Sequence, residues 1–186
     1  MNSPHIEHIL TELQQNNEEA RQFLHGLTEA QMNWVPEPGT WSVAQCLEHL
    51  TVANSEFRPY LEQAIAKARQ RPATTAPYRM TLMGGMLIRA MQQEGGRKYK
   101  APKKFQPLPE PPPGALVRFL GAQRHIASLA ERAQGADITV KMRSPATPFV
   151  RYSLADAFEL IVVHNRRHLR QARRVTERQD FPRLAN

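Results

Sequence analysis

Four long segments of this chain space their apolar residues three and four positions apart, which is the pattern that lines one face of an α-helix. The segments run over residues 4–27, 43–68, 114–133 and 153–175. The stretch 137–142 alternates like a strand, but it is too short to found a sheet. These observations predict an all-α fold, in which residues 1–186 form a single domain built as a four-helix bundle.

The starts of these helices carry local signals. Ser42 with Gln45 and Ser153 with Asp156 have the spacing of capping boxes, in which the two side chains satisfy free backbone N–H groups. Pro59 falls inside the second helix and predicts a bend there, because proline removes one backbone hydrogen bond.

Between the second and third helices the chain changes character. Eight of its 15 prolines lie between residues 71 and 114, which we interpret as a long crossover. Methionine and leucine residues within 80–91 predict one short helix, ended by Gly95 and Gly96 and followed by an extended basic stretch, 97–100.

Composition limits the cellular setting and the classes of function. No apolar run approaches the length of about 20 residues that spans a bilayer, and the first residues lack the pattern of a signal peptide. The single cysteine, Cys46, has no internal disulfide partner, so we expect a cytoplasmic protein. The net charge of +8 raises nucleic acid as a partner. However, the arginines that supply most of it crowd the last helix without any aromatic residue for base stacking, which favours a solvated surface.

The histidines carry the clearest chemical signal. His164 and His168 are spaced i,i+4 on the fourth helix, so their imidazoles lie on one face and can converge on one metal ion. Chance alone gives about 0.26 such pairs in a chain with this histidine content. His168 is also in register with the apolar stripe, and His49 borders the stripe of the second helix. From the residues alone, a three-histidine metal site and ordinary hydrogen-bonded core histidines both remain open.

Other residues near these positions have a functional and a structural interpretation each. Cys46 lies one turn before His49 and either approaches the ion or is a small buried hydrophobe, which we favour. Glu56 and Tyr60 either line a pocket or are a solvated acid and a packed ring. Gln171 either orients a ligand or is exposed. Trp41 either walls a pocket or packs beneath the helix start.

Three segments resemble one known family. The segment 41–50, WSVAQCLEHL, resembles the W-S-x6-H-L motif of the DinB superfamily of metal-dependent enzymes, and 164–171, HNRRHLRQ, resembles its H-x-x-R-H-x-x-Q motif. The segment 102–107 resembles the family's P-x-x-F-x-P crossover. The resemblance implies a four-helix bundle of up-down-down-up topology, often dimeric. It also implies a divalent metal bound by His49, His164 and His168.

A site of this kind supports several reactions. Three imidazoles and an open position can lower the pKa of a bound water, polarise a carbonyl or hold a thiol as thiolate. Asn165 follows His164, so the His-Glu-x-x-His arrangement of metalloproteases is missing. We therefore expect a hydrolase or a thiol transferase that uses zinc or nickel on a small substrate, either a thiol or an anion. The alternative is a non-catalytic, dimerising or ligand-binding bundle with a structural or vestigial site.

Overall fold

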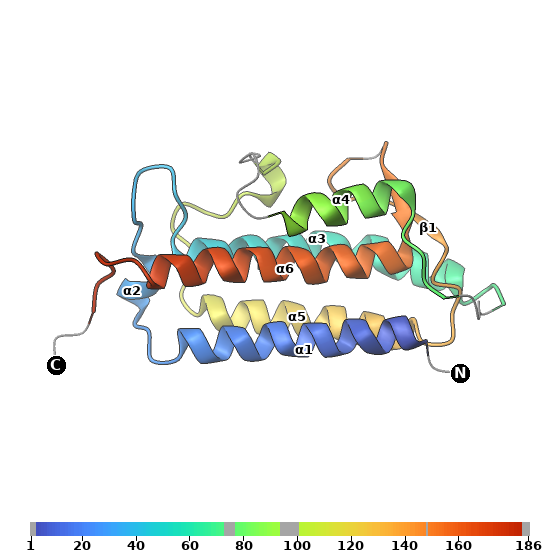
Figure 1. Cartoon of the computed structure of the whole chain (residues 1–186), viewed down its shortest axis with the longest axis horizontal. Coiled ribbons are helices and arrows are strands. Elements are labelled where there is room, and N and C mark those ends of the chain that lie inside the picture. Colours follow the sequence, from blue (N-terminus) through green and yellow to red (C-terminus); the bar gives the residue numbers. More distant parts are fainter. Residues whose placement is uncertain (1–2, 73–76, 94–100, 148, 184–186) are drawn as a thin grey trace.

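The computed structural model describes residues 3–72, 77–93, 101–147 and 149–183, and these are mostly helical. The mostly helical structure is compatible with the predicted all-α class. Four long helices lie side by side: α1 (Pro4–Leu24), α3 (Val43–Ala68), α5 (Ala115–Arg132) and α6 (Leu154–Thr176) (Figure 1). Their bounds agree closely with those expected from the apolar stripes. No helix in the described part is both long and apolar enough to cross a membrane.

The order of these helices around the core follows from their contacts. Both α1 and α3 pack along α5 and also along α6, so α5 and α6 occupy diagonally opposite positions. The helices α1 and α6 begin at the end of the molecule that holds the N-terminus, whereas α3 and α5 begin at the other end (Figure 1). The two helices that carry the histidines of interest, α3 and α6, are therefore antiparallel neighbours.

Capping boxes explain where α3 and α6 begin. Ser42 and Gln45 form a capping box at the start of α3, and Ser153 and Asp156 form another at the start of α6, as predicted. A short helix that we did not expect, α2 (Glu29–Asn33), lies between α1 and α3. Its signal was present in the sequence, because Thr28 and Gln31 form a third capping box.

The crossover packs against α6. It contains the predicted short helix, α4 (Leu82–Gln92), and a 3-10 turn, η1 (Lys103–Phe105). Asp156 accepts hydrogen bonds from the hydroxyls of Tyr78 (2.8 Å) and Thr81 (2.7 Å) before α4 begins. Arg167 donates to carbonyl oxygens at the end of α4, including that of Met91 at 3.2 Å. The predicted Gly95–Gly96 stop and the basic stretch 97–100 lie outside the described residues.

The expectation that the stretch 137–142 is too short to found a sheet was wrong, because its last two residues lie in a paired strand. The strand β1 (Lys141–Arg143) pairs antiparallel with β2 (Arg151–Ser153), so that a two-stranded sheet forms just before α6. Met142 faces Tyr152 in this pairing, and both side chains are buried. The second strand escaped prediction because three residues are too few to show alternation, and pairing with the neighbouring strand supplies what its own pattern lacks.

Candidate metal centre

Three imidazoles from two helices meet at one point. The ring centroid of His49 on α3 lies 4.9 Å from that of His164 and 4.4 Å from that of His168, and the two α6 rings are 4.7 Å apart. The Nε2 atoms of His49 and His164 are separated by 3.1 Å. One potential ligand atom from each residue falls within 4.8 Å of the others, and this is the group of metal-ligating side chains found within the described residues.

Local structure explains this convergence. The capping box at Ser42 fixes the start of α3, and His49 follows in its second turn, where its side chain is 3% exposed. His164 and His168 are one turn apart on α6, so their side chains extend from the same face. Because α3 and α6 pack against each other, the two faces meet.

Two of the imidazoles are held by hydrogen bonds from Nδ1. The Nδ1 atom of His49 lies 2.5 Å from the backbone oxygen of Phe105 in η1, and that of His168 lies 2.9 Å from Oε1 of Gln171. A carbonyl oxygen only accepts, so Nδ1 carries the proton in both rings. The neutral rings then present the Nε2 lone pair, which is the form that binds metal ions.

The surroundings keep these imidazoles neutral. Burial lowers the pKa of His49, although the hydrogen bond to Phe105 partly opposes it. Burial, with smaller contributions from the charges of His49 and Arg167, lowers the pKa of His164 to about 3. Burial also lowers the pKa of His168 well below its usual range, and the neighbouring histidines add to the effect. All three are therefore unprotonated at neutral pH, as metal ligands must be.

Trp41 forms one wall of the site. Its ring centroid lies 4.9 Å from that of His49 and 5.6 Å from that of His168. It is half-buried and sits directly before the start of α3. The indole thus shields two of the three imidazoles from water on this side.

The remaining residues singled out in the sequence lie elsewhere. Cys46 is fully buried in the apolar core, where burial raises the pKa of its thiol to about 12, and it is not among the grouped ligand atoms. Glu56 pairs with Lys104 at 2.9 Å. Tyr60 packs half-buried against the core. The structure places Gln171 against His168. In contrast, Cys46 has the surroundings of a buried hydrophobe, Glu56 those of an ion-paired surface acid, and Tyr60 those of a packed ring.

One orienting group was missed by sequence reasoning. The acceptor for His49 is a main-chain oxygen, that of Phe105, whose ring is buried with 6% exposure. Sequence patterns describe side chains, so the role of a backbone carbonyl 56 positions away is not visible in them. The P-x-x-F-x-P motif marked the segment without indicating this contact.

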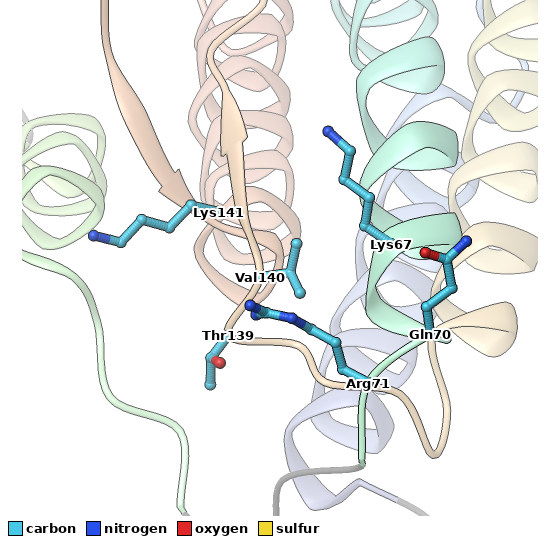
Figure 2. Close-up of a pocket in the computed structure, with 6 residues that line it drawn as sticks. All are labelled: Lys67, Gln70, Arg71, Thr139, Val140 and Lys141. Atoms are coloured by element: carbon cyan, nitrogen blue, oxygen red, sulfur yellow. The ribbon is translucent and has the colours of Figure 1, made fainter.

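A hollow on the described surface is a separate feature. Figure 2 shows it between the end of α3 and the segment leading into β1, with a volume of about 640 Å³ and a lining of Lys67, Gln70, Arg71, Thr139, Val140 and Lys141. Lys67 follows His49 by enough residues to lie about 27 Å along the helix axis. The ammonium groups of Lys67 and Lys141 point in different directions (Figure 2). Because Lys67 lies so far along α3 from His49, this hollow is no part of the histidine cluster.

The donor set fits a divalent cation. Nitrogen ligands 2.0–2.1 Å from a tetrahedral ion lie about 3.3 Å from each other, and the His49–His164 Nε2 separation of 3.1 Å is close to that spacing. Three neutral imidazoles would leave one position of a tetrahedral ion for a further ligand. Such a set suits zinc and several other transition metals.

Comparison with known proteins agrees with this geometry. No curated protein matched the chain, and no solved structure matched it. The sequence model of one family does match, over residues 12–172, a span that contains all three histidines, the crossover and most of each long helix. By this match the chain belongs to the DinB superfamily.

Proposed function

We propose that this protein is a metal-dependent enzyme of the DinB type, folded as a single up-down-down-up four-helix bundle. In this proposal His49, His164 and His168 hold a divalent ion, with zinc or nickel as the metal. The observation that carries the proposal is the convergence of three neutral imidazoles, two of them fixed in the Nδ1–H form by carbonyl acceptors.

The reaction class follows from what the residues offer. A divalent cation with one open position supplies Lewis acidity, which activates a water or a thiol and polarises a carbonyl. Gln171 and the Phe105 carbonyl keep two ligand rings aimed at the centre, and Trp41 limits access of water on one side. We therefore propose hydrolysis or thiol transfer on a small thiol or anionic substrate.

The contacts of the last helix's arginines disfavour the nucleic-acid alternative. Several arginines of the last helix and its extension have acidic partners: Arg166 pairs with Glu12, Arg173 with Glu19 at 3.2 Å, and Arg178 with Glu37 and Asp180 at 2.9 and 2.8 Å. Arg167 donates to the end of α4. These contacts thus engage four of the seven arginines in residues 166–183 within the fold. A small-molecule partner and a homodimer remain our proposal.

Metal analysis of protein purified without an affinity tag tests the proposal. We expect about one equivalent of a transition metal per chain, lost in His168→Ala with retention of the helical content. His125→Ala is the matched control, since His125 lies on α5 outside the cluster. Metal-free protein that also fails to take up zinc or nickel on dialysis would overturn the proposal. A metal that is bound with no exchangeable water would favour the non-catalytic alternative.

A further inference from the structure

Three buried amides meet in the interior of the helical core. The Oε1 atom of Gln123 on α5 accepts hydrogen bonds from Nδ2 of Asn54 on α3 (3.2 Å) and from Nδ2 of Asn165 on α6 (2.9 Å). Gln123 and Asn165 are 0% exposed, and Asn54 is 2% exposed. Each of three helices thus contributes one amide, and we refer to these three residues as the amide node.

The node crosses the core along its diagonal. Since α5 and α6 are diagonally opposite, Gln123 reaches across the centre to contact Asn165 while it also contacts its neighbour α3. One oxygen atom therefore holds both histidine-bearing helices. A rotation or slide of either helix breaks one of the two hydrogen bonds.

The node is also close to the histidines in sequence. Asn165 directly follows His164, and Asn54 comes five residues after His49, or about 7.5 Å along the helix axis. A packed helix is rigid over one or two turns. A displacement of α3 relative to α6 at the amide node therefore moves the imidazoles by nearly the same amount.

Stability alone does not explain these residue types. Within the described part of the chain, Nε2 of Gln123 and Oδ1 of Asn165 have no hydrogen-bond partner. Reversing the oxygen and nitrogen of all three amides leaves the same two positions unpaired. A bridging water would satisfy both, but apolar side chains of the same volume need none and often pack at least as stably. Two unpaired polar atoms in the core lower the stability of the fold, and such a local loss of stability is typical of a site under functional constraint.

We infer that Gln123 is a positioning residue that fixes α3 against α6 and thereby sets the geometry of the three histidines. The inference rests on the proposed function, since the geometry matters because a metal must be held. It assigns a task to α5, a helix that carries none of the ligands. Buried polar residues that specify the register of packed helices at some cost in stability are the best attested use of such groups.

The test measures how tightly variants of the full chain bind Co²⁺, with no other ligand added. The visible absorption of the bound Co²⁺ reports both the affinity and the geometry of the site. Gln123→Met removes both hydrogen bonds at similar volume. We expect about tenfold weaker Co²⁺ affinity, the lower end of the range for residues that orient metal ligands. We also expect a changed absorption band and a lower thermal stability, because Nδ2 of Asn54 and Nδ2 of Asn165 lose their shared acceptor. Asn54→Leu removes only one of the two hydrogen bonds, so its Co²⁺ affinity should lie between those of the wild type and Gln123→Met. If Gln123→Met does not fold, Asn54→Leu is the variant that tests the inference.

Asn16→Leu is the matched control. Asn16 is a buried amide on α1 that donates to the oxygen of Val162 on α6 at 3.3 Å, so it joins two helices without involving α3. We expect it to lower stability while leaving Co²⁺ affinity and absorption unchanged. Equal loss of affinity in Asn16→Leu would show a general packing effect and overturn the inference.

A second readout separates this inference from the proposed function. In metal-free protein the imidazole nitrogen NMR signals report the tautomer of His49, which the Phe105 carbonyl holds as Nδ1–H. Gln123→Met should shift these signals toward a mixture of tautomers. If the wild type binds Co²⁺ and Gln123→Met matches it in affinity, absorption and tautomer, the positioning role is wrong and the metal site stands. If the wild type binds no metal, the proposed function fails, and the tautomer comparison alone decides the role of Gln123.

Discussion

The imidazole of His49 donates its Nδ1–H to the backbone oxygen of Phe105, which lies 2.5 Å away and 56 residues later in the chain. This contact ties the histidine cluster to the end of the crossover. The ring of Phe105 is buried, so the carbonyl is held in place by apolar packing and by the 3-10 turn η1. The crossover is thus a support for the site as well as a connection between α3 and α5.

Removing the Phe105 ring should therefore affect both stability and metal binding. We expect Phe105→Ala to lower the free energy of unfolding by about 3 kcal/mol, as for other large buried side chains. Loss of the anchor also frees the carbonyl and weakens metal affinity. Urea unfolding and metal titration measure the two effects. Lys103→Ala, an exposed position in the same turn, should change neither.

Gln171 offers a cleaner separation of metal affinity from folding. Its Oε1 accepts the Nδ1–H of His168, and its side chain is only half-buried. We expect Gln171→Leu to weaken zinc affinity about tenfold or more, because residues that orient metal ligands have effects of this size. Gln171→Glu keeps an acceptor oxygen and should retain the affinity. Equal zinc affinities of Gln171→Leu and Gln171→Glu would show that the hydrogen bond to His168 does not contribute to metal binding.

The lowered histidine pKa values predict how the stability of the metal-free protein depends on pH. The pKa of His164 is lowered to about 3 from an ordinary value of 6.5. Between these two values the unfolded chain binds a proton that the folded chain does not. The free energy of unfolding therefore falls as the pH drops below about 6.5, by at most about 1.4 kcal/mol per pH unit for each such histidine.

Urea unfolding of metal-free protein at several pH values between 5 and 8 measures this effect. We expect little contribution from these histidines above pH about 7. The double variant His164→Gln, His168→Gln removes two half-buried imidazoles and should flatten the slope on the acid side. An unchanged slope would mean that the acid sensitivity originates in other groups.

The sequence was most informative where structure is local. The stripes and capping boxes of Ser42 and Ser153 act within a few residues, so they located the starts of α3 and α6. The i,i+4 spacing of His164 and His168 likewise guaranteed a shared face. The remaining step, which brings His49 to the same point, depends on how α3 packs on α6, and it was expected only because of the family motifs.

Contacts made by backbone groups, or by single amides on different helices, could not be predicted. The Phe105 oxygen carries no side-chain signature, and the pairing of β1 with β2 depends on three residues in each strand. Asn54, Gln123 and Asn165 interrupt apolar stripes, and a single polar residue on a stripe does not reveal its partner. These features depend on tertiary packing, which an apolar pattern specifies only in outline.

The close approach of α4 to α6 supplies a last prediction, on a pair of adjacent glycines. A Cβ atom added to Gly84 would lie 2.3 Å from Cγ of Asp156. Asp156 is 0% exposed and is held by hydrogen bonds from Tyr78, Thr81 and Ser153, so its side chain has no room to retreat. We expect Gly84→Ala to displace α4 from the start of α6, at a cost of about 1–3 kcal/mol.

Gly85→Ala is the control in the same turn of the same helix. There the added Cβ meets the flexible end of Arg89, whose Nη2 lies 3.1 Å away and can move. Because alanine favours helix over glycine, this variant should be neutral or more stable by up to about 1 kcal/mol. Amide hydrogen exchange within 82–92 distinguishes the two, since an undocked α4 loses its protection only in Gly84→Ala. Equal protection in both variants would mean that α4 does not depend on its contact with Asp156.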